Sequence, residues 1–378
     1  MKILLTGGGT GGHVNPALAI ADIMKLNIPD AEFVYVGTKH GIENSLVERE
    51  GYPMYHVECR GIRRSFSLSN LATAYYVLTA PHKAKRLLEK LRPDVVIGTG
   101  GFACWAPVKA AASLGIPTVL HESNVVPGMA VRRLQNEVDL ILTNFEETVD
   151  ALNAKEKVVH VGNPLRSTYG SYTREEARAK LGIPKEIDFL ILSFGGSRGA
   201  EKVNEAMISV MKNFVLPKEN IMHIHAGGKS SYAQARELFC TAGLADKDRV
   251  RLEEYIYDMP LLMAAADLVI CRAGAMTLTE IARMKKPAIV IPSPNVVENH
   301  QYKNAKVLAD AGAAILLEEK DLNAESIVRE VMELYEAPEY RREMSGKIAR
   351  FGSVDAGRNI YGEITRLLKN KGKIIKSI

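Results

Sequence analysis

The sequence contains little cysteine, and its four cysteines stand far apart. Cys59, Cys104, Cys240 and Cys271 form no C-x-x-C pair, so the sequence indicates neither a zinc site nor a disulfide framework. The simplest interpretation is a protein that works in the reducing cytoplasm.

Long apolar runs are absent too. No window of about 20 residues is predominantly apolar, so no membrane-spanning helix is expected. The apolar stretch in residues 1–5 is too short for a signal peptide. The nearest candidate for membrane contact is the uncharged segment 65–81, which contains several Ser and Thr residues and ends in proline. We interpret it as an amphipathic or interfacial segment.

The chain also lacks a strong charge of one sign and is poor in aromatic residues. Its 49 Lys and Arg and 44 Asp and Glu give a net charge of +5, which does not by itself indicate a nucleic-acid partner. Apolar residues make up 47% and charged residues 25%, fractions that argue against a disordered chain, a collagen or a coiled coil. Thirty glycines beside nine Phe and one Trp point to an α/β protein rich in loops.

What the sequence does contain is a series of short apolar runs that alternate with helical patterns. Strands are predicted at residues 3–5, 33–36, 95–97, 118–120, 140–143, 158–161, 189–193, 221–226, 250–253, 268–271, 288–292 and 314–317. Helices are predicted at residues 16–25, 103–114 and 277–284. Short buried strands that alternate with helices are typical of a parallel sheet covered by helices on both faces.

The order of these elements repeats in two halves. Residues 4–8 and 190–196 each read as a strand followed by a glycine loop, and residues 94–97 and 267–270 each precede a loop, a helix and another strand. The alternative explanation is that all doubly wound sheets share such short sequence patterns, but two tandem domains explain the order of the elements better. We expect the link near residues 162–166. Because ligands bind beyond the carboxyl ends of such strands, the site is expected in the cleft between the domains.

The strongest local signal is the loop TGGGTGGH at residues 6–13, which follows a strand and opens a helix. Asn15 is the predicted N-cap of that helix and Pro16 its first residue. Glycines let a backbone approach a ligand closely and a helix N-terminus favours an anion, so a diphosphate fits. No Walker A motif follows. No acid stands at the end of the second strand, at residues 36–38, which argues against a dinucleotide.

Polar side chains accompany the loops of the first half. His13 is interpreted either as a phosphate ligand or loop stabiliser, or as a general base, since its ordinary pKa suits proton transfer near neutral pH. The loop GTGGF at residues 98–102 offers further backbone N–H groups. The segment HESN at residues 121–124 is either an ordinary polar loop or part of the binding crevice.

The second half repeats the pattern. The loop GGSRGA at residues 195–200 again follows a strand, and Ser197 is placed to donate a hydrogen bond to a phosphate. The segment RAGAMTLTE at residues 272–280 opens a helix, where Glu280 either favours the helix dipole or accepts the hydroxyls of a ribose. The segment ENHQ at residues 298–301 is suited to contact a sugar.

In this order the motifs GGTGGH, GTGG, HExN, GNPxR, GGSxGA, RxGAxTxxE and HQ resemble the MurG family of bacterial peptidoglycan glycosyltransferases, from residue 2 to about residue 352. That family transfers N-acetylglucosamine from UDP-N-acetylglucosamine to the muramoyl-pentapeptide on undecaprenyl diphosphate, converting lipid I to lipid II. The resemblance implies two Rossmann-like doubly wound parallel-sheet domains facing a cleft, the GT-B fold. It places the acceptor domain at residues 1–162 and the UDP-sugar domain at residues 163–352, with a C-terminal helix near residues 353–378 crossing back to the first.

The resemblance also implies roles for single residues. The donor would be bound by Thr10, Gly11, Gly12, Asn124, Arg166, Ser197, Ile256, Ala275, Met276, Thr277, Glu280 and Gln301. The acceptor would be bound by Gly8, Gly9, Gly100, Gly101 and His121. Glu280 would take the ribose hydroxyls, the backbone of Ile256 the uracil edge, and Gln301 and Asn124 the sugar. His13 is the candidate base, and Glu122 is the other candidate catalytic residue.

An α-linked donor and a β-linked family product imply inversion at C1 in a single displacement. The acceptor 4-hydroxyl attacks while a base removes its proton, and UDP leaves beside helix N-termini. No Asp-x-Asp motif stands as an obvious metal ligand, so the sequence requires no protein-bound metal. Mg²⁺ that accompanies the diphosphate stays compatible with this.

Basic residues gather in one segment. Residues 56–92 contain two acids and eight bases, a larger excess than that of the whole chain: Arg60, Arg63, Arg64, Lys83, Lys85, Arg86, Lys90 and Arg92. Apolar side chains lie between them, which fits weak attachment to an anionic membrane surface at about 1 kcal/mol per base. We therefore expect a peripheral enzyme on the cytoplasmic face of the cell membrane, with no nucleic-acid partner. A solvated basic helix beside core aromatic residues is the alternative.

Besides another lipid-acceptor glycosyltransferase of the same fold, three other functions stay open. A UDP-N-acetylglucosamine 2-epimerase shares the two-domain fold but needs carboxylates in the cleft and no membrane patch. A dinucleotide-dependent oxidoreductase is disfavoured by the missing ribose-binding acid. A catalytically inert sugar-nucleotide-binding subunit at the membrane is the third.

Overall fold

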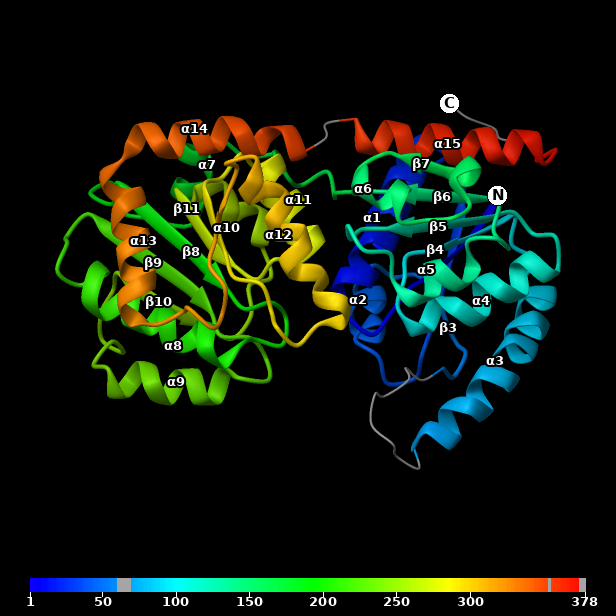
Figure 1. Cartoon of the computed structure of the whole chain (residues 1–378), viewed down its shortest axis with the longest axis horizontal. Helices are drawn as coiled ribbons and strands as arrows, with labels where there is room; N and C mark the ends of the chain where they lie inside the picture. The colour runs from blue at the N-terminus through cyan, green and yellow to red at the C-terminus, as the bar shows by residue number, and fades with distance from the viewer. Residues whose placement is uncertain (60–68, 353–354, 374–378) are drawn as a thin grey trace. The chain divides into compact units, whose positions relative to one another are not determined.

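The computed structural model describes residues 1–59, 69–352 and 355–373. For residues 69–75, 77 and 78 it describes the backbone only. The chain forms two compact units (Figure 1). One comprises Met1–Arg166 together with Val354–Ile378, and the other comprises Ser167–Ser353.

The first unit is built on a seven-stranded sheet in which all neighbours are parallel, in the order β3-β2-β1-β4-β5-β6-β7. The strands are β1 (Lys2–Thr6), β2 (Glu32–Gly37), β3 (Met54–His56), β4 (Val95–Gly98), β5 (Thr118–Glu122), β6 (Leu140–Thr143) and β7 (Val158–His160). The predicted parallel sheet is confirmed. Strand β3 escaped prediction because it is three residues long and pairs only along the edge of the sheet.

Helices cover both faces of this sheet. They are α1 (Gly11–Asn27), α2 (Glu43–Arg49), α3 (Ser69–Leu91), α4 (Phe102–Ser113), α5 (Met129–Leu134), α6 (Glu147–Asp150) and α15 (Ala356–Asn370), with a 3₁₀ turn η1 (Lys155–Lys157). Along β1, Ile3 and Leu5 pack against α1 and α15, whereas Leu4 packs against α3 and α4. A parallel sheet buried on both faces explains why its strands are apolar throughout.

The start of α1 differs from the prediction. The N-cap is Thr10, with an extended backbone (φ −146°, ψ 157°), and the helix begins at Gly11. Asn15 is therefore not the N-cap, and Pro16 lies inside the helix. A proline at this position has no N–H to donate, so the carbonyl of Gly12 loses its intrahelical partner. As a result His13 belongs to the first turn of α1.

The second unit is built on a six-stranded sheet, also parallel throughout, in the order β10-β9-β8-β11-β12-β13. Its strands are β8 (Phe189–Phe194), β9 (Ile221–Ala226), β10 (Val250–Glu253), β11 (Leu268–Cys271), β12 (Ala288–Val290) and β13 (Ile315–Leu316). Each lies within a predicted strand or extends one by a residue. The second predicted parallel sheet is therefore confirmed as well.

The helices of the second unit again form two layers. They are α7 (Arg174–Lys180), α8 (Glu201–Val210), α9 (Tyr232–Thr241), α10 (Met259–Ala265), α11 (Ala275–Arg283), α12 (His300–Asp310), α13 (Ala324–Glu336) and α14 (Pro338–Ile348). A π turn η2 (Met211–Val215) and the 3₁₀ turns η3 (Val297–Asn299) and η4 (Ala349–Phe351) complete it. On β8, Ile191 packs against α8 and α13, and Leu190 packs against α7 and α10.

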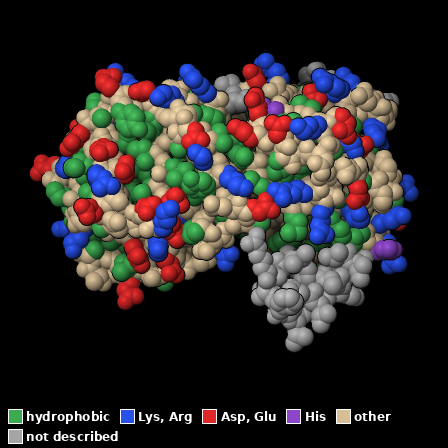
Figure 2. All heavy atoms as spheres, in the orientation of Figure 1, with side chains coloured by type: hydrophobic (Ala, Val, Ile, Leu, Met, Phe, Trp, Pro, Cys, Tyr) green, Lys and Arg blue, Asp and Glu red, His purple; other side chains and the backbone are tan. Residues whose placement is uncertain are grey.

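The basic segment is described only in part. Arg60, Arg63 and Arg64 lie outside the described residues. The second half of α3 buries Ala84 and Leu88 against the sheet and exposes four bases: Lys83, Lys85, Arg86 and Lys90. Over the described part of the chain, no helix combines the length and the apolar character needed to cross a membrane. On the face shown in Figure 2, basic and acidic side chains are interspersed.

Candidate active site

In the first unit the glycine loop after β1 is held by two buried side chains. The hydroxyl of Tyr35 donates a 2.7 Å hydrogen bond to the carbonyl of Gly7. The N–H of Gly9 donates a 3.2 Å hydrogen bond to Oε2 of Glu43. Gly9 has a φ of +87°, a conformation that favours glycine. The loop is thus fixed before any ligand arrives, and neither Tyr35 nor Glu43 was predicted from the sequence.

The imidazole of His13 is oriented by the same loop. Its Nδ1 lies 3.2 Å from the carbonyl oxygen of Gly8 and 3.1 Å from Oγ1 of Thr10. Because a carbonyl only accepts, we assign the proton to Nδ1, which leaves the lone pair of the neutral ring on Nε2. The hydroxyl of Thr99 donates a 2.6 Å bond to the backbone carbonyl of His13. The half-buried ring is therefore held from both its side chain and its backbone.

The loop after β4 packs directly on this histidine. Gly100 and Gly101 have φ values of +100° and +76°. A Cβ at Gly100 would lie 2.8 Å from Cδ2 of His13, and one at Gly101 would lie 2.1 Å from the carbonyl oxygen of Gly8. Only glycine fits both the conformation and the space. The structure thus brings the two predicted loops together around His13.

His121 lies beneath the surface rather than on it. It is fully buried on β5, and its Nε2 donates a 3.1 Å bond to the carbonyl of Gly162. Burial lowers its pKa to about 4, so the ring is neutral. Its Nδ1 has no hydrogen-bond partner among the described residues. This position makes His121 a support for the turn at Gly162, and its predicted contact with the acceptor stays a prediction.

Glu122 organises the loop that follows β5. Its Oε1 accepts 2.9 and 3.0 Å bonds from the backbone and side-chain nitrogens of Asn124, and its Oε2 accepts a 2.7 Å bond from the N–H of Gly128. Burial raises the pKa of this carboxyl, and the hydrogen bonds oppose that shift. Both oxygens hold the loop, including the side chain predicted to bind the sugar.

Arg166 ends the first unit in a pair of salt bridges. Its guanidinium contacts Oδ2 of Asp22 at 3.1 Å and Oε2 of Glu50 at 2.7 Å. Burial raises the pKa of Asp22, and the neighbouring Arg166 opposes that shift. The sequence pattern gave no sign of these two partners. If Arg166 binds the UDP-sugar as predicted, it does so while it is paired with both carboxylates.

In the second unit the predicted donor residues follow four strands of one sheet. Ser197 comes after β8, Ile256 after β10, the first turn of α11 after β11, and Gln301 after β12. Because the carboxyl ends of parallel strands meet at one edge, these residues share that edge. Gln301 also orders the loop before it, since its Oε1 accepts a 2.9 Å bond from the N–H of Ser293.

A buried polar network links β9 to β8 and α8, the two elements that flank the loop carrying Ser197. The hydroxyl of Ser193 lies 2.7 Å from Nε2 of His223 and 2.8 Å from Nδ1 of His225. Nε2 of His225 lies 3.0 Å from Oδ1 of Asn204, whose amide donates to the carbonyl of Gly227. Burial lowers the pKa of both histidines, that of His225 to about 4. The alternating H-x-H in an apolar strand was the only sequence sign of this network.

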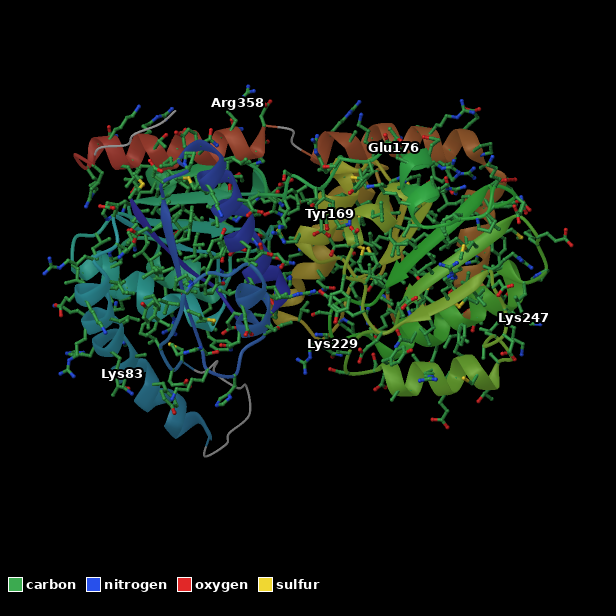
Figure 3. All side chains as sticks on the ribbon, turned by 180° about the vertical axis from the view of Figure 1, so that it is seen from behind. Lys83, Tyr169, Glu176, Lys229, Lys247 and Arg358 are labelled. Atoms are coloured by element: carbon green, nitrogen blue, oxygen red, sulfur yellow. The ribbon has the colours of Figure 1, made fainter. Side chains whose placement is uncertain are left out.

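Helix α11 presents the predicted diphosphate and ribose contacts. Its N-cap is Gly274, so Ala275, Met276 and Thr277 form the first turn. Glu280 lies one turn further on, half-buried. Burial raises its pKa to about 7, and a hydrogen bond from Tyr169 opposes the shift. Figure 3 labels Tyr169, a partner that sequence patterns did not reveal.

No metal site accompanies these groups in the part of the chain that the structure describes, since no cluster of three His, Cys, Asp or Glu side chains is suitably placed. Helix N-termini offer backbone N–H groups to an anionic leaving group. In α1 these include Gly11 and Gly12, whose amides lie in the first turn, where a helix offers its own N–H groups no partner.

Comparison with known proteins identifies the family. The glycosyltransferase family 28 N-terminal domain matches residues 3–143, and the C-terminal domain of that family matches residues 190–360. A relative from Thermoanaerobacter pseudethanolicus is 39% identical over 378 residues, 100% of both chains, and one from Bacillus cereus is 38% identical over 98% of this chain and 100% of its own. Both are named as UDP-N-acetylglucosamine–N-acetylmuramyl-(pentapeptide) pyrophosphoryl-undecaprenol N-acetylglucosamine transferases. The chain belongs to this family, the MurG family of glycosyltransferases.

Solved structures agree with this membership. The crystal structure of Acinetobacter baumannii MurG has a TM-score of 0.72 at 26% identity and covers 97% of this chain and 99% of its own. A UDP-GlcNAc 2-epimerase from Neisseria meningitidis has a TM-score of 0.67 at 17% identity, covering 97% and 100%, and so shares the fold alone. The predicted family, fold class and enzyme class are confirmed. The MurG-family loops surround His13 in the first unit and follow β8, β10, β11 and β12 in the second.

Proposed function

We propose that this protein transfers N-acetylglucosamine from UDP-N-acetylglucosamine to the 4-hydroxyl of the muramoyl-pentapeptide carried on undecaprenyl diphosphate, forming lipid II from lipid I. The observation that carries the proposal is the end-to-end match, at 39% identity, to a relative named for this transfer. The glycine loops that pack around His13 support the assignment of this residue to the chemical step.

The donor binds to the carboxyl edge of the second sheet. The first turn of α11 offers backbone N–H groups and a helix dipole to the diphosphate, and Ser197 adds a hydroxyl donor. Glu280 accepts the ribose hydroxyls in its ionised form, held by the hydroxyl of Tyr169. The backbone at Ile256 meets the uracil. Gln301 reaches the sugar from a loop that it orders itself.

The chemical step is one displacement at C1 of the sugar. The acceptor 4-hydroxyl oxygen forms the new bond to C1 as the bond from C1 to the UDP oxygen breaks, and that electron pair leaves with UDP. The hydroxyl proton passes to Nε2 of His13, the ring nitrogen left basic by the bond from Nδ1 to Gly8. The amides of Gly11 and Gly12, in the first turn of α1, stabilise diphosphate charge.

Glu122 contributes by position. Its two oxygens hold the backbone and amide of Asn124, so the amide meets the sugar in a fixed orientation. Buried His121 maintains the neighbouring turn at Gly162. We assign the proton transfer to His13 rather than to Glu122, because three donated hydrogen bonds already occupy this carboxylate. Mg²⁺ that accompanies the diphosphate would be held by its phosphate oxygens.

The acceptor's lipid chain stays in the bilayer, so the enzyme works at the membrane. The exposed bases of α3, among them Lys83, Lys85 and Arg86, would meet anionic lipid on the cytoplasmic face. Lys83 is labelled in Figure 3. At about 1 kcal/mol per basic group, a few such contacts give reversible, salt-sensitive attachment and no permanent anchor.

A transfer assay tests the proposal. Purified protein is incubated with radiolabelled UDP-N-acetylglucosamine and a lipid I analogue, and labelled disaccharide-lipid is measured. A parallel reaction without acceptor follows the donor for epimerisation at C2. We expect labelled lipid in the first reaction and unchanged donor in the second. Intact substrates after the first reaction would overturn the proposal, and an epimerised donor in the second would favour the epimerase.

A further inference from the structure

Glu43 is a buried carboxylate that the chemical step above does not use. It opens helix α2 and is 0% exposed. Its Oε1 accepts a 3.0 Å bond from the N–H of Thr38 and a 2.7 Å bond from the hydroxyl of the same residue, and its Oε2 accepts the bond from Gly9. Among the residues that the structure describes, none forms an ion pair with it. A buried charge without a cation is costly, and this one is maintained by donors alone.

The sequence leaves room for this carboxylate at three glycines. A Cβ at Gly8 would lie 2.7 Å from Oε1 of Glu43, one at Gly37 would lie 2.7 Å from Cγ, and one at Gly41 would lie 2.0 Å from Oε2. The loop after β1 and the end of β2 with its following loop therefore pack closely around a single side chain. A space-filling apolar residue there would leave the N–H groups of Gly9 and Thr38 without acceptors.

Glu43 and His13 bind the two sides of one peptide group. The N–H of Gly9 and the carbonyl of Gly8 belong to the same planar peptide. That N–H donates to Glu43 at 3.2 Å, and that carbonyl accepts from Nδ1 of His13 at 3.2 Å. An acceptor on the N–H side polarises the peptide and strengthens the bond made by its carbonyl. The carboxylate thus acts on the histidine through a single peptide.

We propose that Glu43 is a positioning residue for His13: through the Gly8–Gly9 peptide it fixes the tautomer with the proton on Nδ1 and leaves Nε2 to accept the proton of the acceptor hydroxyl. The inference rests on the proposed role of His13. It explains why a charge is buried beside a loop that also offers amides to a diphosphate. Glu43 itself touches no reacting atom.

The first test reads the tautomer directly and needs no activity. Histidine is labelled with ¹⁵N, the His13 signals are assigned by their loss in His13→Ala, and the nitrogen shifts are compared in wild type and Glu43→Gln. The glutamine keeps the shape, but its amide nitrogen faces a donor. We expect the Nδ1–H form in the wild type and a mixture of tautomers in the variant. An unchanged Nδ1–H form in folded Glu43→Gln would overturn the inference.

The second test uses the transfer reaction. We expect Glu43→Gln to lower kcat about 10-fold, part of the 10²–10⁴ that a positioned base contributes, with KM for UDP-N-acetylglucosamine within twofold. In a His13→Ala background the same change should have no further effect on kcat, because the imidazole through which Glu43 acts is absent. An equal loss in both backgrounds would contradict a role through His13. If wild type itself makes no product, the proposed function fails while the tautomer result still decides this inference.

The matched control is Asp139→Asn. Asp139 also accepts from the N–H and hydroxyl of one threonine, Thr118, at 2.9 and 3.0 Å, but at the first residue of β5, the amino end of the sheet. The Asp139→Asn change should lower the melting temperature without changing kcat or the tautomer of His13. Should Glu43→Gln not fold, Glu43→Asp retains the charge and withdraws it from Gly9. Glu43→Asp is also expected to give a mixture of His13 tautomers, and a pure Nδ1–H form in this variant would overturn the inference.

Discussion

Asn124 donates two hydrogen bonds to one oxygen of Glu122, from its backbone nitrogen at 2.9 Å and from its side-chain nitrogen at 3.0 Å. The pair fixes the polar loop that follows β5. It also shows that a carboxylate expected to do chemistry is occupied in shaping the residue beside it.

Replacing Glu122 by Gln should therefore impair sugar binding more than the chemical step. The amide puts a donor against donors, so Asn124 loses its fixed orientation. We expect KM for UDP-N-acetylglucosamine to rise several-fold and the free energy of unfolding to fall by about 1–3 kcal/mol. Glu137→Gln, which removes a surface pair with Lys109, is the control and should cost less than about 1 kcal/mol. Unchanged KM and stability in Glu122→Gln would contradict this role.

His13→Ala should separate catalysis from donor binding. Loss of the base should lower kcat about 10²–10⁴-fold, whereas none of the proposed contacts with UDP uses the imidazole, so the affinity for UDP should be kept. Steady-state kinetics with a lipid I analogue and calorimetric titration with UDP measure the two effects. Turnover within a few-fold of wild type would exclude His13 as the base.

Donor affinity should depend on pH through Glu280. Burial raises the pKa of this carboxyl to about 7, so its ionised fraction grows as pH rises through neutrality. In the proposed donor site it is the ionised form that accepts the two ribose hydroxyls. We therefore expect KM for UDP-N-acetylglucosamine to fall between about pH 6 and pH 8. Kinetics across that range, at constant ionic strength, measure it.

Tyr169→Phe extends the same test. The tyrosine hydroxyl lowers the pKa of Glu280 against the effect of burial, so its removal should move the fall in KM to higher pH. Glu280→Gln should abolish the pH dependence and leave a uniformly weak donor site. A KM profile that is identical in wild type and Tyr169→Phe would show that the hydroxyl does not act on this carboxylate.

Membrane attachment should depend on the described bases of α3. Replacing Lys83, Lys85 and Arg86 by Ala should weaken binding to vesicles containing phosphatidylglycerol by about fivefold per residue at low salt. The difference should shrink as salt increases. A triple variant of exposed lysines in the second unit is the control: Lys202, Lys212 and Lys247. Equal losses in the two triple variants would point to charge in general rather than to this helix.

The sequence predicted what depends on local pattern. The glycine loops, the strands before them and the helices after them were all found, because glycine geometry and apolar runs are properties of neighbouring residues. The start of α1 was misplaced, because Pro16 is typical of a first turn and here occupies the second. The complete burial of His121 on β5 was not predicted, because a strand that is buried on both faces is apolar throughout and shows no period-two alternation.

The side chains that support the first glycine loop could not be predicted from local sequence patterns. Tyr35 and Glu43 hold residues 28 and 34 positions earlier in the chain. Such contacts depend on which strands become neighbours. The pairing of β1 with β2 and β4 decides them, and one sequence carries no direct record of it.

The anomeric configuration of the product tests the central claim most directly. The disaccharide-lipid formed from UDP-N-acetylglucosamine and a lipid I analogue is isolated, and the coupling between H1 and H2 of the new N-acetylglucosamine is measured by NMR. The account predicts a single β-linked product, formed by one displacement at C1. An α-linked product, or no disaccharide-lipid from intact substrates, would contradict it.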